Sequence, residues 1–210
     1  MGQAQMTRRT QADRRQKSEK QLIDNAILLI AKRGVEGLRL AELGAAAGYS
    51  RGLAGHYFGT KEVLISRVIE RIFTRYNKLL AKGSEATGLS AINIMVREHV
   101  RTLVEAYPEV VALHEIYRSA STNPDVKEMV ADLTTKRIDS IKSALQQAYN
   151  ANVSSPEFDV HSEAIQLQAF IRGLAALFIV DNKIPIKSVS EDYLRSLGLR
   201  LGLSDESSKA

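Results

Sequence analysis

The chain has 210 residues, of which 44% are hydrophobic and 25% charged, with a net charge of +5 and no cysteine. This length is sufficient for one or two domains with a substantial core, and the composition is ordinary for a soluble globular protein. The lack of cysteine excludes disulfides and thiolate chemistry and fits a reducing compartment. We expect a cytoplasmic protein, since neither a secretory signal nor an apolar run of about 18 residues is evident.

The positive charge is concentrated in the N-terminal part of the sequence. Residues 1–61 contain eleven Lys and Arg and five Asp and Glu, a net charge of +6, so the remaining residues carry −1. Binding to DNA phosphates through counterion release requires such a basic region, although solubility alone also accounts for one. Residues 1–16 are polar and arginine-rich. We expect them to form either a disordered tail or an arm that reaches DNA phosphates or the minor groove.

The hydrophobic pattern predicts a first helix that ends at Gly34, followed by two short helices at 40–47 and 51–58. Ser18 and Gln21 have the spacing of a capping box that would open the first helix, with a slightly earlier start as the alternative. Gly48 ends the second helix, and Ser50 is the expected N-cap of the third. Two helices joined by a short glycine-containing turn form the helix-turn-helix layout, whose second helix enters the DNA major groove.

The glycines of this unit favour DNA binding over an ordinary helical hairpin. Gly44 is expected where a side chain would block close approach. An exposed helical glycine costs up to about 1 kcal/mol relative to alanine, so Gly52 and Gly55 indicate that the backbone approaches another molecule. Lys61 opens the next helix, where a cation is unfavourable unless a phosphate binds nearby. The expected DNA-contacting residues are Arg39, Ser50, Arg51, Gly52, Gly55, His56, Tyr57 and Lys61.

The stretch AELGAAAGYSRGLAGHYFGTKEVL resembles the signature of the TetR family of transcriptional regulators. The matching positions are Leu43, Ala47, Gly48, Tyr49, Ser50, Gly52, Tyr57, Phe58, Gly59, Thr60 and Lys61, with 22–26 and 31–34 in the first helix. The sequence departs from the family at three positions. Arg39 stands where the family usually has Thr, Gly44 where it has Ala, and Gly55 where it has an aromatic Tyr. His56 is the neighbouring candidate for that aromatic contact.

This resemblance covers roughly residues 17–70 and implies an all-α protein, for which we expect about nine helices. It implies a three-helix DNA-binding domain followed by a larger helical domain that binds a small inducer and forms a homodimer. The resemblance also implies that Lys61 contacts a phosphate. The expected divisions are a basic arm at 1–16, the DNA-binding domain at 17–62 with its motif at 40–59, the larger domain at 63–203 and a disordered tail at 204–210.

The last two long helices, at about 159–181 and 188–202, are the expected dimer contact. Small residues in the first of them allow close helix packing, although the same face suits packing within one chain. Ser188 and Glu191 have the spacing of a capping box that would open the second.

Aromatic and polar side chains on otherwise apolar helical stripes are candidates for lining a ligand pocket. Each alone is better explained as part of the core than as pocket lining. His99 is the most informative, because a polar group in the middle of a stripe needs a partner. His114 and Arg118, one turn apart, suit an anionic ligand or solvent equally. The candidates are Phe73, Tyr76, His99, Leu103, Tyr107, His114, Tyr117, Arg137 and Phe170.

The sequence therefore predicts a DNA-binding transcriptional regulator, preferentially a repressor that a small inducer of unknown identity releases from a palindromic operator. Helix 61–82 is expected to carry the ligand-induced shift. An activator or a ligand-independent regulator is the alternative. A helical enzyme or a small-molecule binding protein is a distant one, since no P-loop, metal-ligand spacing or nucleophile–base pattern occurs. We expect no catalytic residue, no metal, no other cofactor and no membrane contact.

Overall fold

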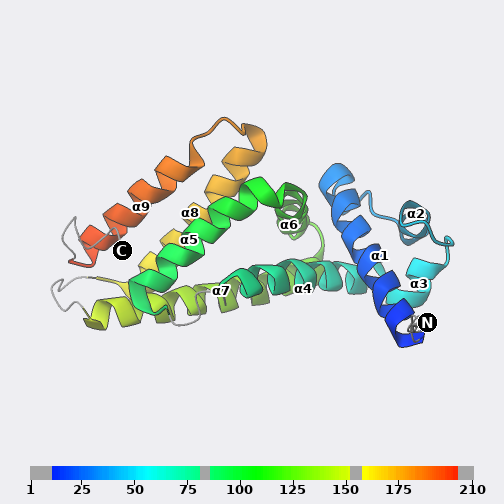
Figure 1. Ribbon diagram of the computed structural model, residues 1–210, viewed down its shortest axis with the longest axis horizontal. Helices are drawn as coiled ribbons and strands as arrows, with labels where there is room; N and C mark the ends of the chain where they lie inside the picture. The colour runs from blue at the N-terminus through cyan, green and yellow to red at the C-terminus, as the bar shows by residue number, and fades with distance from the viewer. Residues whose placement is uncertain (1–10, 81–85, 152–157, 203–210) are drawn as a thin grey trace, which may run out of the picture.

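The computed structural model describes residues 11–80, 86–151 and 158–202, with the side chains of 76–80 excepted. Within these ranges the chain forms nine helices and no strand, which confirms the all-α prediction. The helices are α1 (Gln11–Arg33), α2 (Leu40–Ala46), α3 (Leu53–Phe58), α4 (Lys61–Leu80), α5 (Gly88–Glu105), α6 (Tyr107–Ser119), α7 (Pro124–Ala151), α8 (Val160–Val180) and α9 (Ile186–Arg200). In Figure 1, α1, α2 and α3 lie at one end of the molecule, and α5, α8 and α9 at the other.

One apolar cluster joins the two ends of the molecule. Leu22 and Ile30 of α1 belong to the same cluster as Phe58 of α3, Ile116 of α6 and Val130 of α7. The division expected near residue 62 therefore does not coincide with a break in packing. A second cluster holds α5, α7, α8 and α9 together, and a third fills the space between α5 and α8. The α6 helix packs on α1 and on α5, and Figure 1 places it between them.

The start of α1 differs from the prediction. The helix begins at Gln11, so residues 11–16 are helical rather than part of a disordered arm. Ser18 lies inside the helix, where its hydroxyl donates to the carbonyl oxygen of Arg14 over 3.0 Å. Gln21 accepts a hydrogen bond from the hydroxyl of Tyr49 instead of capping the helix. Residues 1–10 and the tail at 204–210 lie outside the described residues.

The helix-turn-helix unit has the predicted order but a later start of α3. Ser50 does not cap α3 with its side chain; its carbonyl oxygen accepts from the amide of Leu53 over 3.1 Å, and Gly52 is the N-cap residue. Gly48 ends α2 with a positive φ of 78°, which glycine adopts without strain. A Cβ on Gly44 would lie 2.3 Å from the carbonyl oxygen of Ser50. The expectation that no side chain fits there is confirmed, and the obstacle is the turn itself.

At the N-terminal end of α8 the structure has a cap that the sequence analysis did not predict, and at that of α9 the predicted cap is wrong. Asp159 caps α8, because its carboxylate accepts from the amides of His161 and Ser162. The α9 helix begins at Ile186, directly after a proline, so the capping box expected at Ser188 lies inside it. The Ser188 hydroxyl donates back to the carbonyl oxygen of Pro185 over 3.0 Å. The loop expected at 154–156 lies outside the described residues.

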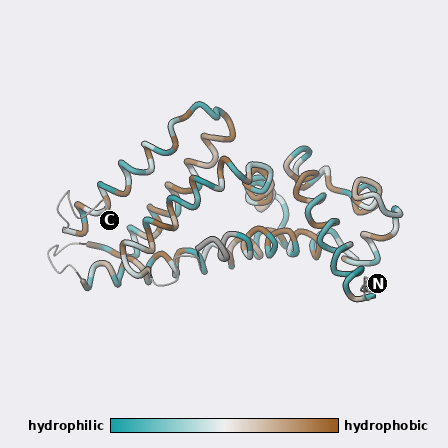
Figure 2. The backbone as a smooth tube through the Cα atoms, in the orientation of Figure 1, coloured by the Kyte–Doolittle hydropathy of each residue, from teal (hydrophilic) through white to brown (hydrophobic). Residues whose placement is uncertain are grey.

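By length and composition alone, α8 is long and apolar enough to cross a membrane, which corrects the expectation that no segment is. A core helix of a soluble protein meets the same criterion. Of the most apolar 18-residue window of α8, 44% is buried inside the protein, where the helix packs against α5 and α7. Figure 2 shows hydrophobic residues along this helix. The apolar character of α8 is therefore partly accounted for by the core.

Two glycines of the helix-turn-helix unit predict opposite effects of the same substitution. Gly44→Ala is expected to destabilise the protein by about 1–3 kcal/mol, because the added methyl group meets backbone. Gly55→Ala, in α3, places its methyl group more than 4 Å from any described side chain or other element and is expected to stabilise the protein by up to about 1 kcal/mol through higher helix propensity. Urea denaturation of both variants measures the difference. Equal effects of the two substitutions would contradict the packing described here.

Candidate nucleic-acid interface and helical cavity

Contacts with α1 and the core hold the α3 helix in place. Ala54 and Phe58 are buried in the apolar cluster that α1 also enters. The hydroxyl of Tyr57 donates to the carbonyl oxygen of Arg15 over 3.2 Å, and the Arg15 guanidinium lies 5.8 Å from the centre of the tyrosine ring. Tyr57, expected to contact DNA, therefore faces α1. One side of α3 is thus fixed to the protein and the other is left for solvent or a partner.

The other expected DNA-contacting residues are accessible. Arg39, Ser50, Arg51, Gly52 and His56 are exposed, and Gly55 and Lys61 are partly exposed. Apart from sequence neighbours and the helix's own backbone, no atom of the described residues lies within 4 Å of where a Cβ would stand on Gly52 or Gly55, so the backbone there is open to close approach. These residues come from the start of α2, the turn before α3, α3 itself and the first residue of α4, and Figure 1 places these segments at one end of the molecule.

The start of α4 has the geometry of a capped helix terminus. The Thr60 hydroxyl oxygen accepts from the amide of Val63 over 3.3 Å, which confirms the predicted cap. Lys61 is the first residue of this helix. Its charge lies where the helix dipole disfavours a cation and favours an anion.

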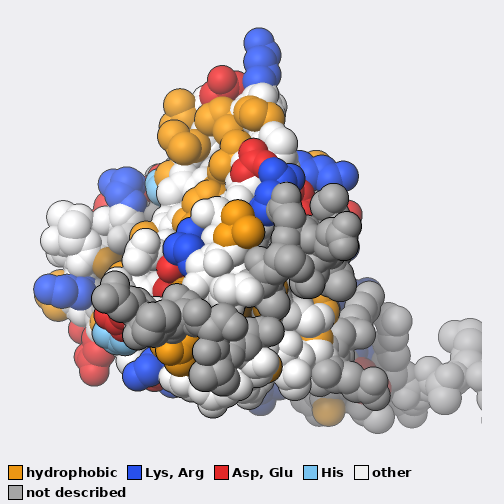
Figure 3. All heavy atoms as spheres, turned by 90° about the vertical axis from the view of Figure 1, so that its left-hand side faces the viewer, with side chains coloured by type: hydrophobic (Ala, Val, Ile, Leu, Met, Phe, Trp, Pro, Cys, Tyr) orange, Lys and Arg blue, Asp and Glu red, His pale blue; other side chains and the backbone are white. Residues whose placement is uncertain are grey.

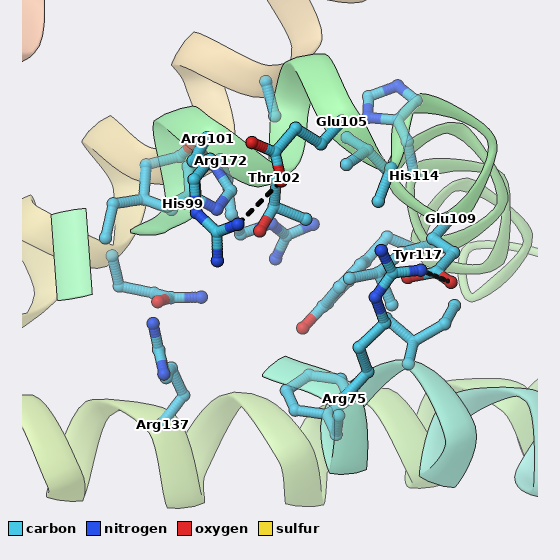
Figure 4. A pocket seen from close by; sticks show the side chains of 18 residues that line it. Arg75, His99, Arg101, Thr102, Glu105, Glu109, His114, Tyr117, Arg137 and Arg172 are labelled. Atoms are coloured by element: carbon cyan, nitrogen blue, oxygen red, sulfur yellow. Dashed lines mark hydrogen bonds and ion pairs between the residues drawn. The ribbon is translucent and has the colours of Figure 1, made fainter. Parts of the chain in front are cut away.

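A cavity of about 150 Å³ lies among α4, α5, α6, α7 and α8 (Figure 4). Of the nine residues expected to line a pocket, it is lined by Phe73, His99, His114, Tyr117 and Arg137. Its remaining lining residues are Ile72, Arg75, Arg101, Thr102, Glu105, Ala106, Glu109, Val110, Leu113, Gln168, Ile171, Arg172 and Ala175. The cavity thus has an apolar surface interrupted by charged side chains.

Three of the expected lining residues lie elsewhere. Leu103 is buried in the cluster between α5 and α8. Tyr107 meets Phe178 edge-on, with ring centres 6.3 Å apart, and Phe170 stacks on Tyr193 with ring centres 4.1 Å apart. These side chains pack in the core or between helices, which is the alternative role named for such residues in the sequence analysis. The side chain of Tyr76 lies outside the described part.

Sequence reasoning missed most of the charged lining. Arg75 of α4 pairs with Glu109 of α6 over 2.6 Å, and Arg101 pairs with Glu105 one turn along α5 over 2.7 Å. The second pair has the spacing of an ordinary solvated ion pair, so the sequence gives no sign that it borders a cavity. The first pair joins residues 34 positions apart, and only the fold brings them together.

His99 is held as a neutral imidazole at the cavity wall. Its Nε2 lies 3.2 Å from the carbonyl oxygen of Ile171, the partner that the sequence required but did not identify. The pKa of His99 is lowered to about 4, mainly by burial and also by the charge of Arg137, while the hydrogen bond to the carbonyl oxygen of Ile171 opposes both. Because a carbonyl oxygen only accepts, Nε2 carries the proton and Nδ1 is left as a hydrogen-bond acceptor.

Two more polar side chains mark the cavity. The guanidinium carbon of Arg172 lies 3.6 Å from the centre of the Tyr117 ring, within the range of a cation–π contact. Gln168 is only 8% exposed, and its Oε1 has no hydrogen-bond partner among the described residues. A buried oxygen without a partner costs free energy, so a donor supplied by a ligand would be favourable there.

His114 and Arg118, which suited an anion in the sequence, do not form a common site. His114 lines the cavity, whereas the Arg118 guanidinium pairs with Glu115 over 2.8 Å and lies 3.2 Å from where a Cβ on Gly34 would stand. Arg118 thus belongs to the contact between α6 and the end of α1. No group of three metal-ligating side chains occurs in the described ranges.

Comparison with known proteins agrees with this architecture. Residues 22–68 match the model of the bacterial regulatory proteins of the tetR family. The HTH-type transcriptional regulator CymR of Pseudomonas putida is 39% identical over 79 residues, which cover 36% of this chain and 39% of CymR. The HTH-type transcriptional regulator BetI of Rhizobium meliloti is 28% identical over 113 residues, covering 53% of this chain and 56% of BetI. The chain therefore spans about half or less of the length of these relatives.

Solved structures extend the likeness to nearly the whole fold. A putative TetR-family transcriptional regulator from Rhodococcus sp. has a TM-score of 0.75 at 19% identity and covers 89% of this chain and 99% of its own. A putative transcriptional regulator from Saccharomonospora viridis, in complex with choline, has a TM-score of 0.72 at 15% identity and covers 85% and 96%. Residues 22–68 thus form a helix-turn-helix domain of the kind found in the tetR family of bacterial regulatory proteins, and nearly the whole chain has the fold of these solved regulators.

Proposed function

We propose that the protein is a homodimeric transcriptional regulator that binds a palindromic operator and leaves it when a small molecule enters the helical cavity. The observation that carries the proposal is the accessible side of α3. There the backbone at Gly52 and Gly55 is open, while the opposite side is fixed by Ala54, Phe58 and Tyr57. A helix that is held rigidly and has glycines on its accessible side can bring its backbone close to DNA in the major groove.

The basic residues around α3 support a role in phosphate binding. Arg39, Arg51 and Lys61 are accessible at the same end of the molecule. Phosphate contacts set affinity for any sequence, whereas base-edge contacts set discrimination. We assign Lys61 to a phosphate, because it stands at a helix N-terminus, and Arg51 to a base edge, because it directly precedes α3.

Exposed apolar residues of α8 and α9 support dimerisation. Leu177 is 56% exposed and Val180 87% exposed, and Ile165 and Leu199 are also exposed. Figure 3 shows hydrophobic side chains gathered in the upper part of the face where α9 and the α8–α9 connection lie. Apolar groups on this scale mark interaction surfaces. A dimer would present two α3 helices to two half-sites about one helical turn of DNA apart.

Coupling between the cavity and the DNA-binding unit runs through α6 as well as α4. The α6 helix lines the cavity with Leu113 and Tyr117, and these residues also pack against the cluster that Ala112 and Ile116 of the neighbouring face share with α1. The ion pair between Arg75 and Glu109 ties α4 to α6 at the cavity wall. The sequence prediction named only the long fourth helix. A ligand that moves α6 would weaken DNA binding by the same factor by which DNA weakens ligand binding.

Small-molecule binding also has support from a protein of similar fold, since the regulator from Saccharomonospora viridis has been solved with choline. We further infer a cytoplasmic protein without catalytic activity, as its relatives are transcriptional regulators. The alternatives for the same fold are an activator of transcription and a regulator that needs no ligand. Whether the protein activates or represses depends on the position of the operator.

Substitutions at Arg51 and Lys61 test the two assigned roles. Arg51→Ala is expected to relax discrimination at one base position, at a cost of about 1–3 kcal/mol on the preferred sequence. Lys61→Ala is expected to weaken binding to all sequences alike and to lower the salt dependence by about one ion. Fluorescence anisotropy with DNA from upstream of its own coding sequence, and with an unrelated duplex, measures both.

Lys136→Ala is the matched control, because Lys136 is an exposed residue of α7 that pairs only locally with Asp132. It should leave DNA affinity unchanged. If Arg51→Ala and Lys61→Ala had the same effect on specific and unrelated DNA, the role assignment would be wrong. If neither changed affinity, α3 would not be the DNA-reading element.

Leu177→Glu tests the dimer surface. A charge in the centre of an apolar contact is expected to raise the dissociation constant of the dimer by at least about tenfold, since an unpaired buried charge is costly. Sedimentation velocity over a range of concentrations measures this. Leu28→Glu is the control, because Leu28 of α1 is similarly exposed but distant in the fold. A wild-type protein that sediments as a monomer at all concentrations would contradict the proposal.

A further inference from the structure

The side chains that line the cavity carry more positive than negative charge. Four arginines and two glutamates line it. Glu109 is already paired with Arg75, and Glu105 with Arg101. Even when Glu98, which also binds Arg101, is counted, the arginines outnumber the carboxylates by four to three. A cationic ligand would meet carboxylates that are already paired, whereas an anion meets an excess of guanidinium charge.

Two of these arginines come from opposite walls. Arg137 projects from α7, whereas Arg172 lies on α8, beside His99 on the other side of the cavity (Figure 4). No carboxylate of the described residues lies within ion-pairing distance of Arg172, whose guanidinium stacks on the ring of Tyr117. Stacking fixes the plane of a guanidinium and leaves its N–H donors at the edge, the geometry that binds a carboxylate.

The same cavity also holds hydrogen-bond acceptors. The Oε1 of Gln168 is buried and has no partner among the described residues, and the Nδ1 of neutral His99 carries a lone pair. Neither group can bind the oxygens of a carboxylate through these atoms. A ligand that satisfies Gln168 therefore carries a hydrogen-bond donor, such as a hydroxyl group, in addition to its anionic group.

The remaining lining limits the size of the ligand. Ile72, Phe73, Val110, Leu113 and Ala175 form its apolar part. The cavity volume is about 150 Å³, and an engineered apolar cavity of roughly that volume holds one benzene molecule. The apolar portion of the ligand is thus about one ring.

We propose that the cavity binds a small organic carboxylate with an apolar part of about one aromatic ring and a hydroxyl or similar donor. The carboxylate binds the guanidinium groups of Arg137 and Arg172, the ring lies against Phe73 and Leu113, and the donor reaches Gln168. The assignment rests on the proposed function only where it makes this molecule the effector; binding itself is independent of DNA.

Calorimetric titration of the intact protein without DNA tests the charge of the ligand. The probes are benzoate, neutral benzamide and cationic benzylamine, which share one ring, and the three hydroxybenzoate isomers. Benzoate is expected to bind at least tenfold more tightly than benzamide and benzylamine, and at least one hydroxybenzoate more tightly than benzoate. Benzylamine or benzamide binding as tightly as benzoate would overturn the proposal.

Variants of the lining test the placement of the groups. Arg137→Met and Arg172→Met are each expected to weaken benzoate binding at least tenfold, and Arg137→Lys to weaken it less because the charge remains. Arg195→Met on α9, outside the cavity, is the control and should bind benzoate normally. Circular dichroism and thermal melting establish that each variant is folded. Unchanged benzoate affinity in both folded methionine variants would overturn the assignment.

Gln168→Leu separates a ligand role from a purely structural one. The variant is expected to raise the melting temperature of the ligand-free protein, because it removes a buried oxygen without a partner, and to abolish the preference for hydroxybenzoate over benzoate. A preference that survives in this variant would show that Gln168 does not bind the donor.

Adding the same probes to the protein–DNA complex distinguishes the two proposals. Carboxylate binding that leaves DNA affinity unchanged would uphold the ligand class and contradict ligand-controlled release. Release of DNA by benzylamine but not by carboxylates would uphold the regulator and overturn the ligand class.

Discussion

The structure depends on the apolar packing of α1. This helix contributes Leu22, Ala26 and Ile30, all fully buried, to a cluster that includes α2, α3 and α4 on one side and α6 and α7 on the other. Without α1, the six-residue α3 helix would have too few internal hydrogen bonds to persist, since isolated short helices are marginal in water. The position of α3 is thus set by tertiary packing, and the same packing connects it to the cavity.

Because interiors are close-packed, a displacement at one side of this cluster is felt at the other. The α6 helix occupies the decisive place, since it borders the cavity and also packs against α1. Arg118 and Glu115 in the C-terminal part of α6 lie next to Gly34, the residue that follows α1. A ligand in the cavity, as proposed, and a duplex on α3 would therefore both act on one connected body. This arrangement gives the proposed regulation a physical route that needs no disordered intermediate.

Sequence reasoning succeeded where structure is determined locally. The helix order, the stop at Gly34, the cap at Thr60 and the need for glycine at position 44 all follow from spacing, propensity and turn chemistry. It failed where a local pattern has a second use. Ser18, Ser50 and Ser188 were each expected to cap a helix. In the fold, the hydroxyls of Ser18 and Ser188 donate to backbone carbonyl oxygens instead. Ser50 uses its carbonyl oxygen, which accepts from the amide of Leu53.

The cavity shows the limit of local reasoning most clearly. Aromatic and polar side chains on apolar stripes predicted five lining residues, Arg137 among them, but most of the charged lining was missed, because ion pairs at helical spacing are usually solvated. Arg75 meets Glu109, and His99 meets the carbonyl oxygen of Ile171, only through the tertiary fold. The resemblance at residues 17–70 is confirmed by the match of residues 22–68 to the tetR family model. It did not extend to the helices that form the cavity, so it could not predict which side chains line it.

Amide hydrogen exchange of the full chain, free and bound to DNA from upstream of its own coding sequence, tests the central claim most directly. If the packing of α1 couples the two ends of the molecule, DNA binding should slow exchange in α2 and α3 and also in α6, which contains none of the expected DNA-contacting residues. Slowed exchange that stops at α3, with α6 unchanged in the bound state, would contradict the account.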